Sequence, residues 1–276
     1  MSDYQQIAVD QPRPKVMRVT LNRPEKLNAT TALMMQELAA FFTSVKRDAE
    51  THVVVLRGAG RAFCAGHDLK EVPEREPYAL SRDEWFIEQK AVFDDMDLYR
   101  RMIAEVPQPV IAQIHGYCYT VGIELSMSCD LVYASDDLKM PIRMAGGAGR
   151  YIHMLPWLVG VRKAKEILFR GSVITGEEAY RLGIANGVAP KDELDDYVLA
   201  IAEQIGRVPL EFLALDKQAT NKCLDLMGAR DAIDYSATLH AVSHRTPAGL
   251  AQFEGLYLSG DWRKAAQERD ARYVNG

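Results

Sequence analysis

Hydrophobic positions in the first half of the chain follow two patterns that alternate along the sequence. Residues 15–24, KVMRVTLNRP, alternate apolar and polar side chains as a half-buried strand does. Continuous apolar runs at 52–58 (HVVVLRG) and 108–116 (QPVIAQIHG) are typical of strands covered on both faces. Further elements are expected at 32–46, from Asp83 onward and at 122–128, all helical, and at 129–135, a strand. This order of strands and helices predicts an α/β protein.

After Val161 the periodicity becomes mostly helical. Helices are expected within 162–171 (RKAKEILFRG), 175–183 (TGEEAYRLG), 192–208 (DELDDYVLAIAEQIGRV) and 211–228 (EFLALDKQATNKCLDLMG), and most of the remaining chain. Thr175 with Glu178 forms a capping-box pattern, and Gly171 and Gly183 stand where helices stop. Thr30 or Thr31 is expected to cap the earlier helix at 32–46.

Composition narrows the class of protein. The 276 residues are 48% hydrophobic and 26% charged, as in a globular domain, and the formal net charge is −5. This charge gives no reason to propose nucleic acid or an anionic membrane as a partner. No apolar run approaches the ~20 residues that span a bilayer, and the N-terminus lacks the apolar core of a signal peptide. We therefore expect a cytoplasmic protein.

Cysteine and histidine spacings do not predict a metal site. Cys64, Cys118, Cys129 and Cys223 lie far apart in the sequence, without the spacing of metal ligands. In a reducing compartment they are expected to be free thiols that act as small apolar residues. His240 and His244 could share a helix face, but no third ligand is evident.

Two stretches combine a strand with a turn of small residues. One is RAFCAGHDLKEV at 61–72, which follows VVVLRGAG, and the other is IHGYCYTVGIELSMSCDLVYAS at 114–135. Two such turns can direct two backbone N–H groups at one point, which is the physical requirement of an oxyanion hole. The second turn also begins a helix, whose dipole would add to the effect. From spacing alone this signal is weak, since many strand–turn–helix units only pack.

The order of several motifs is far more specific than either turn. NRPEKLNA, GAGRAFCAGHDLKE, PVIAQIHGY followed by G-x-E-L and CDLVYAS, and RKAKEILFRG followed by ITGEEAYRLGIAN occur in succession. This succession resembles the crotonase (enoyl-CoA hydratase/isomerase) superfamily over nearly the whole chain. The resemblance implies a spiral of ββα units, here 1–200, with a helical C-terminal region, 201–276, that packs a homotrimer or a dimer of trimers.

The resemblance also implies a site for an acyl-CoA thioester, with coenzyme A as part of the substrate and no separate cofactor. The thioester carbonyl would accept hydrogen bonds from the N–H groups of His67 and Val121, and Glu124 would act as the general acid or base. Lys26 and Lys70 would lie near the phosphates. The other residues expected to contact CoA or substrate are Leu27, Ala65, Gly66, Asp68, Leu69, Tyr119 and Gly122.

The chain departs from the family pattern in two places. Thr120-Val121-Gly122 stands where the family has three glycines; the N–H of Val121 survives, because only proline removes it. Hydratases of the family also carry a second glutamate, expected here near Pro141-Ile142, but no Asp or Glu occurs from Leu138 to Lys165. Asp136 and Asp137 come too early and are expected to be solvated.

The missing acid leaves several reactions open. One carboxylate fits double-bond isomerisation, decarboxylation or cleavage of a β-diketone or β-ketoacyl C–C bond more easily than hydration, which needs both activation of water and protonation of carbon. A catalytically silent acyl-CoA-binding member is a further alternative. Side chains that could supply the missing partner are Tyr119, Arg143, Tyr151 and His153.

Structural interpretations compete with several of these assignments. Taken alone, Glu124 could be a surface glutamate that complements a helix dipole. His67 is expected to contribute its N–H rather than its imidazole, and His115 is expected to be a structural histidine at a strand end. Asp68 is expected to stabilise its own loop through local hydrogen bonds.

Overall fold

The computed structural model describes residues 4–68, 102–142, 154–244 and 246–253, with residues 264, 267, 268 and 271. The first half of the described chain contains the elements β1 (Ile7–Arg13), β2 (Val16–Leu21), η1 (Pro24–Lys26), α1 (Ala32–Val45), β3 (Val53–Gly58), β4 (Ala62–Cys64), β5 (Val110–Ile114), β6 (Tyr117–Cys118), α3 (Val121–Ser128), β7 (Leu131–Ser135) and β8 (Lys139–Pro141). The second half contains α4 (Leu155–Val159), α5 (Val161–Arg170), β9 (Val173–Thr175), α6 (Gly176–Arg181), β10 (Gly187–Ala189), α7 (Leu194–Gly206), α8 (Leu210–Leu226), α9 (Ala229–His244) and α10 (Pro247–Phe253).

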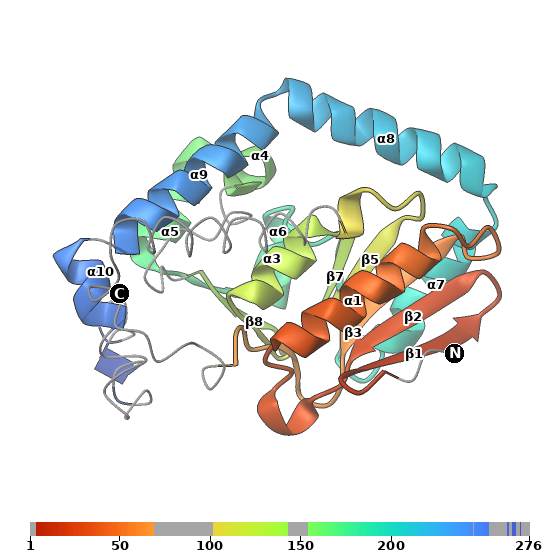
Figure 1. Ribbon diagram of the computed structural model, residues 1–276, viewed down its shortest axis with the longest axis horizontal. Helices are drawn as coiled ribbons and strands as arrows, with labels where there is room; N and C mark the ends of the chain where they lie inside the picture. Colours follow the sequence, from red (N-terminus) through yellow and green to blue (C-terminus); the bar gives the residue numbers. More distant parts are fainter. Residues whose placement is uncertain are drawn as a thin grey trace.

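The larger sheet has six strands in the order β1-β2-β3-β5-β7-β10. β1 pairs antiparallel with β2, and all other neighbours in this sheet are parallel. Successive side chains of β3 point to opposite faces of the sheet. Val54 and Leu56 belong to the core cluster that contains residues of α1, whereas Val53 and Val55 belong to the cluster that contains residues of α7. Helices α1 and α7 therefore lie on opposite faces of the sheet (Figure 1), which is why the apolar runs of the parallel strands are continuous.

A second, smaller sheet has the order β4-β6-β8-β9. Its strands are two or three residues long; β4, β6 and β8 run parallel, and β9 is antiparallel to β8. Each of β4 and β6 leads into one of the two small-residue turns, so this sheet sets the two turns side by side.

Helices dominate the chain after β10. Figure 1 shows α8 and α9 meeting at a corner and lying away from the six-stranded sheet, while α7 packs against that sheet. One buried ion pair ties α8 to the body of the molecule: Lys217 Nζ lies 2.7 Å from Asp130 and donates to the carbonyl oxygens of Ile103 and Gln108. None of the helices in the described part of the chain combines the length and apolar character needed to cross a bilayer.

Most of the expected elements are present, and the α/β class is confirmed. The strand at 15–24 is β2, the helix at 32–46 is α1, and the strands at 52–58, 108–116 and 129–135 are β3, β5 and β7. Thr31, rather than Thr30, caps α1 by accepting the N–H of Met34 at 3.1 Å. Thr175 caps α6 in the same way, and Gly171 ends α5 in the left-handed region.

Other elements were missed or lie elsewhere. The sequence patterns did not predict β1, β9 or β10, nor the smaller sheet as a unit. The helix expected from Asp83 onward lies outside the described residues. The division between 1–200 and 201–276 stays a prediction, and α7 spans that boundary. Cys64 and Cys118 are buried, but Cys223 is exposed and so does not act as a core residue.

Candidate active site

The two small-residue turns lie directly against each other. Cys64 and Cys118 are register partners on β4 and β6, and the chain enters the first turn after Cys64 and the second after Cys118. The N–H of Tyr119 donates to the carbonyl of Cys64 at 2.9 Å, which joins the start of the second turn to the end of β4. These two distant segments are therefore neighbours in the fold, and the convergence of the His67 and Val121 N–H groups on one carbonyl oxygen stays a prediction.

Two glycines allow this close approach. Gly66 has φ +99°, and a Cβ added there would lie 1.9 Å from Thr120 Oγ1. A Cβ added at Gly122 would lie 2.7 Å from the carbonyl oxygen of Cys64. A side chain at position 122 would push the turns apart, because a real Cβ does not approach a backbone carbonyl so closely, and a side chain at position 66 would displace the Thr120 side chain.

The amide of His67 has a defined orientation. Thr30 pairs with the two residues that flank His67. The N–H of Thr30 donates to the carbonyl of Gly66 at 2.7 Å, and the carbonyl of Thr30 accepts the N–H of Asp68 at 2.9 Å. In an extended chain the N–H groups of successive residues point to alternate sides. The N–H of His67 therefore points away from Thr30. Its side chain is exposed.

The N–H of Val121 stands at the first position of α3, where N–H groups have no partner within the helix. Glu124 follows three residues later, on the same face of the helix. The Glu124 side chain is enclosed, with 5% of the residue exposed, and this excludes its interpretation as a surface glutamate. A buried carboxylate and a helix N-terminus thus share one face of α3.

A loop before α1 supports the first turn. Asn28 is fully buried; its Oδ1 accepts the N–H of Arg23, and its Nδ2 donates to the carbonyls of Ala59 and Ala62. The carbonyl of Leu27 accepts the N–H of Ala65 at 3.0 Å. These bonds place Leu27 and the exposed Lys26 beside the first turn.

Asp68 makes an ion pair that the sequence did not reveal. Its carboxylate lies 2.8 Å from Arg23 Nη2, and both side chains are mostly buried. Arg23 also donates to the carbonyl of Ala29 at 2.6 Å. Asp68 thus stabilises its loop through a partner 45 residues away in the sequence, and the local hydrogen bonds expected of it stay a prediction. No spacing signal could have paired Arg23 with Asp68, because their contact depends on the fold.

Comparison with known proteins identifies the family. The profile of the enoyl-CoA hydratase/isomerase family matches residues 12–254. The chain belongs to the enoyl-CoA hydratase/isomerase family. The resemblance to the crotonase superfamily is thereby confirmed, and so is the enzyme class.

Individual relatives agree with this assignment. EchA13 of Mycobacterium tuberculosis, named provisionally as an enoyl-CoA hydratase, is 32% identical over 93% of this chain and 87% of its own length. The human mitochondrial Δ(3,5)-Δ(2,4)-dienoyl-CoA isomerase is 29% identical over 73% of this chain and 64% of its own length. The crystal structure of an enoyl-CoA hydratase/isomerase from Xanthobacter autotrophicus Py2 superposes with a TM-score of 0.83 at 31% identity, covering 98% of each chain.

The region expected to carry a second acid is apolar where it is described. Ile142, which follows Pro141, is 1% exposed and belongs to the main core cluster. Arg143, Tyr151 and His153 lie outside the described residues, as do Leu69 and Lys70.

Asp137 has a structural role just before this region. It accepts the N–H of Gly116 and the hydroxyl of Ser135, and it pairs with Lys191 at 2.8 Å. Partial burial raises the pKa of Asp137, but the bonds from Lys191, Ser135 and Gly116 outweigh it and lower the pKa to about 2. Asp137 is therefore bound within the fold rather than simply solvated, whereas Asp136 is exposed.

Other candidate groups near the turns are structural. The His115 ring lies 2.9 Å from the carbonyl of Gly60, and burial lowers the pKa of His115, as befits a neutral histidine at a strand end. Burial raises the pKa of the Cys64 thiol to about 12, so this thiol is not a nucleophile at neutral pH. Its sulfur instead lies 3.4 Å from the N–H of Gly66 and accepts a weak hydrogen bond from it.

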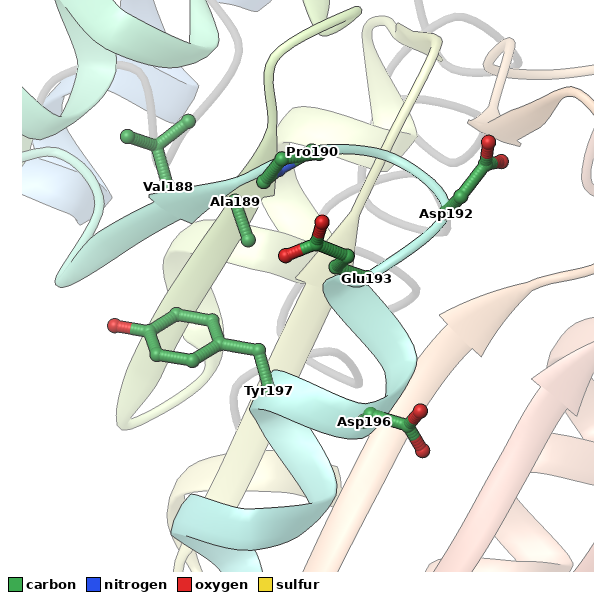
Figure 2. Close-up of a pocket in the computed structure, with 7 residues that line it drawn as sticks. All are labelled: Val188, Ala189, Pro190, Asp192, Glu193, Asp196 and Tyr197. Atoms are coloured by element: carbon green, nitrogen blue, oxygen red, sulfur yellow. The ribbon is translucent and has the colours of Figure 1, made fainter.

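A separate pocket lies between β10 and the start of α7 (Figure 2). Its volume is about 490 Å³, and none of its described lining residues belongs to either turn; these residues are Val188, Ala189, Pro190, Asp192, Glu193, Asp196 and Tyr197. Its three carboxylates would repel the phosphates of CoA. This pocket is therefore not the CoA site.

Proposed function

We propose that this protein acts on an acyl-CoA thioester by stabilising its enolate between the N–H groups of His67 and Val121, with Glu124 moving the proton. The observation that carries this proposal is the direct contact between the two turns, with a buried glutamate on the helix that one of them begins. The family match supports the substrate class.

The chemistry follows from the charges involved. Removal of a proton next to a thioester carbonyl places negative charge on its oxygen, and each preorganised N–H donor contributes about 3 kcal/mol to the transition state. Little water reaches the enclosed Glu124 carboxylate, which would exchange the proton at the carbon next to the carbonyl.

A one-base reaction fits the residues best, and double-bond isomerisation is the first candidate. Ile142 is buried in the core near the place where hydratases of the family carry their second acid, and no carboxylate occurs from 138 to 165. One relative is named as a dienoyl-CoA isomerase, and this supports the same choice. C–C bond hydrolysis and decarboxylation use the same oxyanion hole and remain alternatives, as does a silent acyl-CoA-binding protein.

A panel of CoA thioesters, assayed by mass spectrometry, separates these reactions. The panel contains 3-enoyl, 2-enoyl, β-keto and β-diketo thioesters. Isomerisation of the 3-enoyl thioester with little hydration of crotonyl-CoA is the expected result. Cleavage of the diketone would favour C–C bond hydrolysis, and CoA binding without any turnover would favour the silent alternative.

The Glu124→Gln variant tests the acid/base role. It should bind the same thioester with similar affinity and lose most of its turnover, on the order of 10²–10⁴-fold. Glu177→Gln is the matched control, because Glu177 also lies in the first turn of a helix but is exposed. Unchanged turnover in Glu124→Gln would refute the role.

Contacts to CoA are proposed for the segments around both turns. Lys26 is exposed beside the first turn, where its ammonium can meet a phosphate, and Lys70 is proposed for the same role. Leu27, Ala65, Gly66 and Leu69 would contact CoA, and Asp68, Tyr119 and Gly122 would border the acyl group.

Assembly as a homotrimer or a dimer of trimers is supported by apolar side chains on the C-terminal helices. Large exposed apolar residues on α8, α9 and the turn between them are Phe212, Leu215, Leu226, Met227, Tyr235, Leu239 and Val242. Burial of such a surface between copies would remove it from water. Analytical ultracentrifugation gives the mass directly, and a monomer at micromolar concentration would refute the proposal. Location in the cytoplasm also stays a prediction.

A further inference from the structure

Thr120 has a backbone conformation that is unusual for a residue other than glycine. Its φ and ψ are 43° and −107°, a region that suits glycine and that strains a β-branched residue. Thr120 also stands at the N-cap of α3, where a threonine side chain normally accepts an N–H of the first turn, and it makes no such bond. The side chain is directed instead toward Gly66.

The contact between Thr120 and Gly66 joins the two peptide units that carry the donors. The N–H of His67 belongs to the peptide that follows Gly66, and the N–H of Val121 belongs to the peptide that follows Thr120. Thr120 Oγ1 fills the space in which a Cβ of Gly66 would lie, at 1.9 Å from that position. Thr120 Oγ1 therefore packs against Gly66, where the two turns meet, and limits how close the turns come.

We propose that Thr120 is a positioning residue whose side chain, through the γ atom that packs on Gly66, sets the separation of the His67 and Val121 N–H groups. This inference rests on the proposed function, since it concerns how the same two donors meet one carbonyl oxygen. Thr120 is half-buried and its Oγ1 lies against Gly66, so loss of this contact would let the turns move relative to each other. A misplacement near 1 Å costs about 10²-fold in rate.

Three substitutions separate spacing from other roles. Thr120→Val keeps two γ atoms and removes the hydroxyl, so it should retain kcat within a few-fold. Thr120→Ala removes both γ atoms and keeps the strained backbone, and it should lower kcat by about 10- to 100-fold with little change in KM. Thr120→Gly also removes them but relieves the strain, so it should melt at an equal or higher temperature while losing the same activity. Thr43→Ala, on the exposed face of α1, is the control.

Infrared difference spectroscopy of bound acetyl-CoA, labelled with ¹³C at the carbonyl, tests the geometry without turnover. Two well-placed donors lower the stretching frequency of the carbonyl. The wild-type protein and Thr120→Val should show this shift, and Thr120→Ala and Thr120→Gly a smaller one. Equal shifts in all four proteins would overturn the positioning role and leave the proposed function standing. If Thr120→Val lost as much of the frequency shift as Thr120→Ala, the effect would belong to the hydroxyl, and this result would also overturn the positioning role. Absence of binding or of any shift in the wild-type protein would overturn the proposed function, and the positioning role with it.

Discussion

Asn28 offers the most direct test of how the loop before α1 holds the first turn. The residue is fully buried, and its side chain makes three hydrogen bonds to the backbone at Arg23, Ala59 and Ala62. Its φ of 54° lies in the left-handed region, which asparagine tolerates better than alanine does. Two substitutions, Asn28→Ala and Asn28→Gly, therefore remove the same bonds but differ in backbone cost.

The magnitude follows from these contacts. Each lost hydrogen bond that leaves a buried backbone partner unsatisfied costs about 1 kcal/mol or more, so the three bonds together contribute roughly 3 kcal/mol to the free energy of unfolding. The left-handed conformation adds about 1 kcal/mol for alanine and nothing for glycine. We expect losses of about 4 kcal/mol for Asn28→Ala and about 3 kcal/mol for Asn28→Gly.

Urea unfolding at one fixed protein concentration, followed by circular dichroism, measures both values. Asn22→Ala is the control, since Asn22 is exposed in the same loop. The denaturant dependence must stay unchanged for the free energies to be compared. A loss below 1 kcal/mol in Asn28→Gly would refute the reasoning, because it would mean that the three bonds contribute little.

Two further predictions concern charged residues away from the turns. Lys217→Met should lower the free energy of unfolding by about 3–5 kcal/mol, because it leaves the Asp130 carboxylate buried without its ion-pair partner. Lys222→Met, on the exposed side of α8, is the control and should change this free energy little. A loss in Lys217→Met no larger than the loss in Lys222→Met would contradict the prediction. Asp137→Asn should cost about 1 kcal/mol at neutral pH after allowance for its partial exposure. Because the folded pKa of Asp137 is lowered to about 2, this contribution is complete above the unfolded pKa near 4 and is lost as the pH falls toward 2. Thermal melts of both proteins from pH 7 to pH 2 should converge at the acid end, and a constant difference would contradict the assignment.

Periodicity predicted the elements that carry their own pattern. The parallel strands β3 and β5 are continuous apolar runs, and α1 shows its buried face at helical spacing, so both kinds were found. The short strands β4 and β6 have no such pattern, because pairing with each other defines them. The ion pairs Arg23–Asp68 and Lys217–Asp130 were missed for the same reason: the fold alone brings their partners together.

The sequence predicted the candidate site where the backbone requires a small residue, because the glycines and alanines of the two turns are visible in the sequence. Gly122 is constrained by a carbonyl oxygen of Cys64, which cannot move without breaking β4, so no larger residue fits there. Position 120 faces Gly66 instead, and the missing Cβ of that glycine leaves room for the threonine side chain. A family pattern of three glycines therefore contains positions with different physical constraints. The loss of one glycine at 120 says nothing against an oxyanion hole, whereas a side chain at 122 would have removed the contact on which it depends.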